Sequence, residues 1–168
     1  MDIKLIATDI DGVWTDGGMY YDNLGGEFKK FSVYDGGGVL LAHAMNIPVC
    51  IMTGEQTQIV ERRAEKLKID YLFQGQKNKL ETLKGLCEEL KIDLKEVAYI
   101  GDDFNDIEVI KAVGFSAMPA STPDIFVKYA DVILSKNGGE GVFREFVEKI
   151  LENQNMLSIA IDRILGSK

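Results

Sequence analysis

Near the start of the chain, the stretch Ile3-Lys4-Leu5-Ile6-Ala7-Thr8 is followed by Asp9-Ile10-Asp11-Gly12, and together they give the clearest indication of the fold class. Its first six residues form a short, mostly apolar run, which is typical of a buried strand. The next four place two carboxylates two residues apart, and then a glycine. Ligands of parallel sheets bind beyond the carboxyl ends of the strands. The residues that follow this strand are therefore the first candidates for a functional site.

Outward from this stretch, strand-like and helix-like patterns alternate. Short apolar runs predict further strands over residues 47–52, 70–73, 97–100, 115–117 and 131–134. Apolar residues spaced three and four apart predict helices over residues 37–45, 56–68, 78–90, 106–112 and 142–151. This alternation predicts the α/β class, with a doubly wound parallel sheet and helices on both of its faces.

One segment departs from the alternation. Two β-rich runs, Met19–Asp22 and Glu27–Phe31, flank the turn sequence Asn23-Leu24-Gly25-Gly26. Such a pattern predicts a β-hairpin. Because the hairpin follows the Asp9 loop directly, we expect residues 19–31 to form a flap over the site.

Length and composition limit the other possibilities. The 168 residues predict a single domain over 1–168, ending in an apolar tail over 155–168. The net charge of −8 argues against a nucleic-acid partner, and no apolar run approaches the roughly 18 residues of a membrane span. Cys50 and Cys87 form no CxxC motif and no signal-peptide pattern opens the chain, so we expect reduced thiols and a cytoplasmic protein.

Acidic, hydroxyl and glycine residues follow three of the predicted strands. The first strand is followed by Asp9 and Asp11, the second by Thr53-Gly54-Glu55, and the third by Gly101-Asp102-Asp103-Phe104-Asn105-Asp106. Carboxylates gathered at one edge are costly unless a positive ion balances them. Mg²⁺ prefers such oxygen ligands, and carboxylates with Mg²⁺ suit phosphoryl transfer.

These segments resemble a known set of motifs. Asp9-Ile10-Asp11-Gly12-Val13, Thr53-Gly54, Lys79 and Gly101-Asp102-Asp103-x-x-Asp106 are similar, in this order, to the four motifs of the haloacid dehalogenase superfamily of phosphatases. The resemblance extends over essentially the whole chain.

The resemblance implies a role for each catalytic position. Asp9 would be the nucleophile that forms an aspartyl-phosphate. Asp11 would protonate the leaving alkoxide and then deprotonate the attacking water. Thr53 would donate a hydrogen bond to a phosphoryl oxygen, and Lys79 would neutralise charge on the nucleophile and the phosphate.

The resemblance also implies a metal site. Asp9, Asp102 and the backbone carbonyl of Asp11 would hold Mg²⁺. Asp103 and Asp106 would lie behind these ligands and orient waters or Lys79.

The spacing of the motifs leaves no room for a cap domain. The hairpin and one helix fill the chain between Asp9 and Thr53, and two helices and a short strand fill the chain between Thr53 and Asp102. Residues 9–17, 31–36, 73–79 and 138–145 closely resemble the capless, tetrameric phosphatases of 3-deoxy-2-keto sugar acids. The resemblance implies a phosphorylated sugar acid as substrate and a homo-oligomer, expected to be a tetramer, whose neighbouring subunit roofs the site.

A departure from this pattern bears on the substrate. The octulosonate branch of these phosphatases usually has Thr-Gly-Arg where this chain has Thr53-Gly54-Glu55. Glu55, with Arg63 and Lys66, looks more like the branch that acts on nonulosonate 9-phosphates (of KDN or an N-acylneuraminate). Arg63 and Lys66 would meet the sugar-acid carboxylate, from this subunit or the next. We therefore expect a nonulosonate 9-phosphate, with 3-deoxy-D-manno-octulosonate 8-phosphate as the alternative.

Two other classes of protein also fit part of the pattern. A phospho-receiver signalling domain likewise places an Asp, a Thr and a Lys at strand ends, but it does not need an acid–base group two residues after the phosphorylated Asp. Asp11 therefore favours an enzyme. A catalytically idle subunit is disfavoured because the chemical positions are all intact.

Overall fold

The central element is a fully parallel six-stranded sheet. The structure, a computed structural model, describes residues 2–166. The strands lie in the order β5-β4-β1-β6-β7-β8. Their bounds are β1 Leu5–Thr8, β4 Val49–Met52, β5 Tyr71–Phe73, β6 Val97–Ile100, β7 Phe115–Met118 and β8 Val132–Ile133.

The chain winds in both directions from β1, which lies between β4 and β6. Ala7 pairs with Cys50 on one side and with Tyr99 on the other. A strand whose two neighbours are reached in opposite directions marks a topological switch point, beyond whose carboxyl end ligands bind. This position brings the loops after β1, β4 and β6 together.

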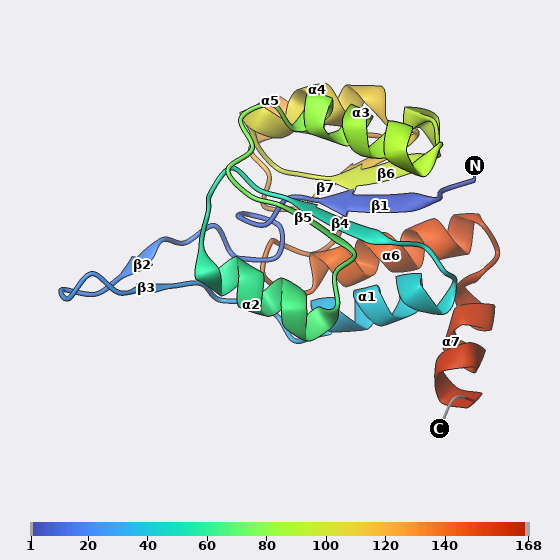
Figure 1. The fold of residues 1–168 in the computed structure, drawn as a ribbon, viewed down its shortest axis with the longest axis horizontal. Helices are drawn as coiled ribbons and strands as arrows, with labels where there is room; N and C mark the ends of the chain where they lie inside the picture. The colour runs from blue at the N-terminus through green and yellow to red at the C-terminus, as the bar shows by residue number, and fades with distance from the viewer. Residues whose placement is uncertain (1, 167–168) are drawn as a thin grey trace.

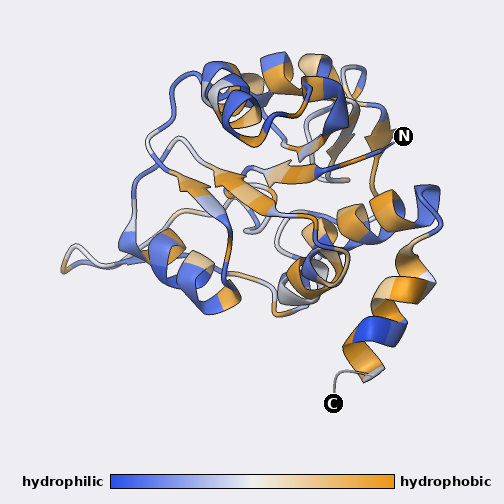
Figure 2. Ribbon diagram, turned by 45° about the vertical axis from the view of Figure 1, so that its right-hand side comes forward, coloured by the Kyte–Doolittle hydropathy of each residue, from blue (hydrophilic) through white to orange (hydrophobic). Residues whose placement is uncertain are grey.

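Helices cover both faces of the sheet (Figure 1). One face packs against α1 Tyr34–Ala44, α2 Gln58–Leu67 and α6 Val142–Asn153, and α7 Leu157–Gly166 packs in turn on α1 and α6. The other face packs against α3 Lys79–Leu90, α4 Ile107–Ala112 and α5 Asp124–Val127. Two short 3₁₀ turns, Leu94–Glu96 and Phe104–Asp106, precede β6 and α4. The sheet is apolar along its strands, as expected for strands that are buried on both faces (Figure 2).

The hairpin extends outward from the body of the molecule (Figure 1). Its strands, β2 Tyr20–Tyr21 and β3 Glu27–Phe28, pair antiparallel with Tyr20 opposite Phe28. None of residues 20–28 is buried, and Leu24 at the tip is 96% exposed. The structure thus confirms the hairpin and leaves its aromatic side chains without a covering surface among residues 2–166.

The predicted α/β class is confirmed, and within the described residues no cap domain interrupts it. Residues 157–166, predicted only as an apolar tail, form α7, which packs against α1 and α6. Residues 167–168 of that tail lie outside the described residues. Among the helices described, none is long and apolar enough to cross a membrane.

Candidate active site

The functional side chains meet in a cavity at the carboxyl edge of the sheet. The cavity has a volume of about 390 Å³. It is lined by Asp9, Asp11, Met19, Thr53, Gly54, Glu55, Asp102, Asp103, Phe104 and Asn105. The loops after β1, β4 and β6 therefore each contribute to one site.

Trp14 fixes the loop after β1. Its side chain is fully buried, its indole N–H donates to Thr8 Oγ1 at 3.0 Å, and its ring stacks on Phe143 with centroids 4.6 Å apart. Backbone amides of residues 13–15 donate to the Ile10 carbonyl and close a tight turn. This anchoring fixes the backbone of the loop that carries Asp9 and Asp11.

Asp9 is a buried carboxylate with a shared oxygen. Its Oδ1 accepts a hydrogen bond from the Ile10 amide at 2.8 Å and lies 3.0 Å from Lys79 Nζ. Burial, with the charge of Asp106, raises the pKa of Asp9 to about 7. Both of these contacts fall on Oδ1, and Asp9 also lines the cavity, where a carboxylate can meet a metal ion or a phosphorus atom.

Lys79 is fully buried at the first position of α3, where Asn78 caps the helix. Its ammonium lies 2.7 Å from Asp106 Oδ1 as well as 3.0 Å from Asp9. Burial alone would lower the pKa of Lys79, but Asp9 and Asp106 raise it above the usual value. Lys79 is therefore a cation held beside the nucleophile position.

Asp106 holds the loop after β6 in place through hydrogen bonds. Its Oδ1 also accepts the Tyr99 hydroxyl at 2.5 Å, and its Oδ2 accepts the amides of Asp102 and Asp103. Both oxygens are thus already engaged by the protein. Although the carboxyl oxygens of Asp9, Asp102 and Asp106 lie within 4.8 Å of one another, Asp106 is placed to orient rather than to bind an ion.

Asp102 is the side chain that most clearly fits a metal. Its buried Oδ1 has no hydrogen-bond partner among the described residues. Burial, followed by the charges of Asp9 and Asp106, raises the pKa of Asp102 to about 8. A divalent cation would give Oδ1 a ligand and would offset the repulsion between Asp102, Asp9 and Asp106. Gly12 sits against this carboxylate at φ +85°, and a Cβ there would collide with Asp102 Oδ2, so glycine is required.

Thr53 and Asp103 both line the cavity, and both are held by local hydrogen bonds. The Thr53 amide donates to the Phe73 carbonyl at 2.9 Å, which links the loop after β4 to the end of β5. Asp103 Oδ1 accepts the Phe104 amide at 2.7 Å and caps the 3₁₀ turn. Thr53 thus lies where it can donate to a bound anion, and Asp103 stands at the cavity rim.

Lys29 completes the site, although the sequence reasoning missed it. Its ammonium lies 2.6 Å from Asp11 Oδ1 and 2.7 Å from Glu55 Oε2, and its side chain is only 1% exposed. A signal was available: Lys29 lies two residues before Phe31, which packs against the core, so the two share a face of an extended segment.

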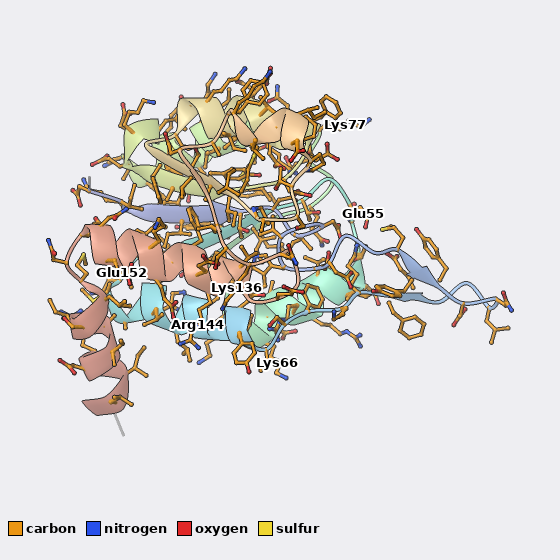
Figure 3. All side chains as sticks on the ribbon, turned by 180° about the vertical axis from the view of Figure 1, so that it is seen from behind. Glu55, Lys66, Lys77, Lys136, Arg144 and Glu152 are labelled. Atoms are coloured by element: carbon orange, nitrogen blue, oxygen red, sulfur yellow. The ribbon has the colours of Figure 1, made fainter. Side chains whose placement is uncertain are left out.

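Arg63 and Lys66 do not line this cavity. Arg63 donates to the Ser32 carbonyl at 2.9 Å and lies over the Phe31 ring, 5.6 Å from its centroid. Lys66 is exposed and lies well apart from Glu55 (Figure 3). Their assignment to the sugar carboxylate stays a prediction.

Comparisons with known proteins agree with this geometry. Residues 69–146 match the family model of the haloacid dehalogenase-like hydrolases. The 3-deoxy-D-manno-octulosonate 8-phosphate phosphatase of Salmonella typhi is 40% identical over 158 residues, which cover 94% of this chain and 84% of that protein.

Two solved structures are similar throughout. A probable YrbI-family phosphatase from Pseudomonas syringae pv. phaseolica is 42% identical with a TM-score of 0.93, over 97% of this chain and 93% of that one. The 3-deoxy-D-manno-octulosonate 8-phosphate phosphatase of Moraxella catarrhalis, solved with a magnesium ion, a phosphate ion and KDO, is 38% identical with a TM-score of 0.92, over 96% and 93% of the two chains.

The fold, the acidic cavity and these likenesses define a phosphatase, a hydrolase of phosphate monoesters. More narrowly, the chain belongs to the haloacid dehalogenase-like hydrolase family, and the resemblance predicted from its four motifs is confirmed. The comparisons thus favour the enzyme over the receiver-domain alternative.

Proposed function

We propose that this chain is a Mg²⁺-dependent phosphatase of a 3-deoxy-2-keto sugar acid phosphate. The observation that supports it most is the buried, unpartnered Oδ1 of Asp102 beside the buried Asp9 carboxylate. Asp9, Asp102 and the carbonyl of Asp11 would hold the ion, which would supply positive charge against the carboxylates and the phosphate. The Mg²⁺ and phosphate bound by the Moraxella relative support the same reading.

The residues of the cavity suit a two-step reaction. In the first step Asp9 attacks phosphorus, forming an acyl–phosphate bond, while the bond from phosphorus to the sugar oxygen breaks and Asp11 gives that oxygen a proton. In the second step Asp11 takes a proton from a water molecule that attacks phosphorus, and the acyl–phosphate bond breaks. Lys79 and Thr53 hold the transferring group between these two carboxylates.

The comparisons favour 3-deoxy-D-manno-octulosonate 8-phosphate as the substrate, because the 40% identical Salmonella relative acts on it. One observation favours the nonulosonate 9-phosphate as a second candidate. Glu55 lines the cavity beside Thr53, and its carboxylate is partly exposed, so it can accept hydrogen bonds from sugar hydroxyls while repelling a carboxylate.

A panel of the two sugar acid phosphates tests this choice. We expect phosphate release from at least one of them at a kcat/KM well above that for p-nitrophenyl phosphate. Glu55→Arg should shift the kcat/KM ratio toward the octulosonate 8-phosphate by about 10–200-fold, as expected for one contact to a charged group. An unchanged ratio would show that Glu55 does not select the substrate.

We also propose that the active form is a homo-oligomer, most simply a tetramer, in the cytoplasm. Tyr21, Leu24 and Phe28 of the hairpin are more than half exposed, and Met19, just before the hairpin, lines the cavity. Light scattering at micromolar concentration should give a mass of about four chains, and a monomer would contradict this proposal.

A further inference from the structure

The ammonium group of Lys29 is buried at the edge of the active site. It comes from the hairpin, directly after β3, and its side chain is withdrawn from solvent. Three carboxylates surround it: Asp11 Oδ1 at 2.6 Å, Glu55 Oε2 at 2.7 Å and Glu27 Oε1 at 3.7 Å. A buried lysine is destabilising unless it is paired and hydrogen-bonded, so this geometry makes the contacts to Asp11 and Glu55 obligatory.

The adjacent residue shows that this placement is specific. Lys30 points away from the cavity; its side chain is 64% exposed and its ammonium lies 3.6 Å from Asp16. Side chains alternate along an extended segment, so Lys29 and Lys30 take opposite sides. The chain thus provides a matched pair of lysines, one inside the site and one outside it.

The contact to Lys29 determines how Asp11 is oriented. Asp11 Oδ1 accepts from Lys29 Nζ at 2.6 Å and from Thr15 Oγ1 at 3.4 Å. The Asp11 side chain is otherwise 28% exposed at the edge of the cavity, where it could rotate. With Oδ1 held, Oδ2 is the oxygen left to exchange a proton with the leaving group or with water.

We propose that Lys29 is a positioning residue that holds Asp11 for proton transfer and makes the base of the hairpin part of the catalytic apparatus. This inference rests on the proposed function, in which Asp11 is the acid–base group. Lys29 acts on the reaction through Asp11 and does not itself contact the phosphate. Its second contact, to Glu55, links the loop after β4 to the same ammonium.

The test is a double-mutant cycle measured with p-nitrophenyl phosphate, which lacks the sugar hydroxyls and carboxylate that Glu55 would meet. Lys29→Met should lower kcat about 100-fold with KM changed less than about 3-fold, because misplacing a proton-transfer group affects the chemical steps. In the Asp11→Asn background the same substitution should lower kcat less than about 3-fold, since the group that Lys29 positions has already been removed.

Two control variants keep the result interpretable. Lys30→Met should leave kcat and KM unchanged, and Lys29→Arg, which retains the charge, should recover at least about a tenth of the lost activity. Circular dichroism and thermal melting should show that Lys29→Met folds. Should it not fold, Lys29→Gln enters the same cycle in its place.

The outcomes separate this inference from the proposed function. If Asp11→Asn alone retains full kcat, the acid–base role of Asp11 fails, and the proposed mechanism fails with it. If Asp11→Asn is impaired and the Lys29 substitution lowers kcat by the same factor in both backgrounds, Lys29 acts independently of Asp11. The inference is then overturned while the proposed function stands.

Discussion

Asp9 and Asp11 stand two residues apart on the loop after β1, yet their surroundings suit them to different work. Asp9 is buried against Lys79, whereas Asp11 lies at the cavity edge against Lys29. A buried carboxylate fixed beside Lys79 is suited to attack phosphorus, and a partly exposed one at the cavity edge is suited to exchange protons with water. Their substitutions should therefore have different effects.

We expect Asp9→Asn to abolish turnover, because the amide cannot form the acyl–phosphate bond. Asp11→Asn should slow turnover roughly 10²–10⁴-fold and let a phosphoenzyme accumulate, because proton transfer to and from the reacting oxygens is lost. Acid quenching with ³²P-labelled substrate measures both. Substantial steady-state turnover by Asp9→Asn would contradict the assignment of the nucleophile.

Asp35 provides a prediction about stability rather than catalysis. It is fully buried in the first turn of α1, where Oδ1 accepts the Arg144 amide at 3.3 Å and Oδ2 has no partner among the described residues. Burial raises the pKa of Asp35 to about 6, although the amides of Arg144 and Phe143 and the charge of Arg63 lower it in part.

A carboxyl group with a raised pKa in the folded state destabilises that state as it ionises. The penalty is absent below about pH 4 and fully present above about pH 6. The free energy of unfolding of the wild type, relative to Asp35→Asn, should therefore fall by on the order of 3 kcal/mol over this range. Urea titrations of both proteins at pH 4, 5, 6 and 7 measure it, and a pH-independent difference would show that folding leaves the pKa of Asp35 unchanged.

The sequence could predict the residues whose chemistry is local. Asp9, Asp11, Thr53 and Asp102 each follow a buried strand within a few positions, so their meeting at one edge follows from the parallel sheet alone. Lys29 was missed because its inward direction depends on how the extended segment after β3 packs on the body through Phe31. That packing is a tertiary contact, which the lysine's place in the sequence does not reveal.

Among the helices and strands, those marked by a local pattern were predicted well, and those that depend on tertiary contacts were not. Val97–Ile100 was predicted with the bounds that β6 has, because an apolar run between polar neighbours marks both ends. Helix α7 was predicted only as an apolar tail. Its apolar residues pack on α1 and α6, so its helical form depends on tertiary contacts that a single sequence does not display.

The hairpin is the element whose role is most open to direct test. Replacing residues 20–28 with a Gly-Asn-Gly turn removes only residues that are not buried and keeps Lys29. The melting temperature should change little, because no core contact is lost. If the hairpin helps a second copy to roof the site, kcat/KM for sugar acid phosphates should fall at least about 10-fold while turnover of p-nitrophenyl phosphate is retained.

Light scattering on the shortened protein reports the assembly directly. We expect a smaller species than the wild type, since Tyr21, Leu24 and Phe28 are gone. An unchanged mass together with unchanged kcat/KM for sugar acid phosphates would show that the hairpin neither joins copies nor covers substrate.

For the whole molecule, the position of the site is set by the topological switch point at β1, which lies between β4 and β6. Two groups of helices cover opposite faces, and the loops that emerge between them bring acidic side chains from β1 and β6 together with Thr53 from β4. The alternation of patterns predicted the parallel sheet and its two covered faces. It did not predict the strand order, because pairing between distant strands depends on packing rather than on local sequence.

Metal-dependent catalysis by this chain can be measured as phosphate release from 3-deoxy-D-manno-octulosonate 8-phosphate and from a nonulosonate 9-phosphate, with and without a chelator. We predict release in Mg²⁺, loss to background after EDTA treatment and dialysis, and recovery when Mg²⁺ is restored, with Asp9→Asn inactive throughout. Full activity in the metal-free protein, or no release from either substrate in the presence of Mg²⁺, would contradict the account.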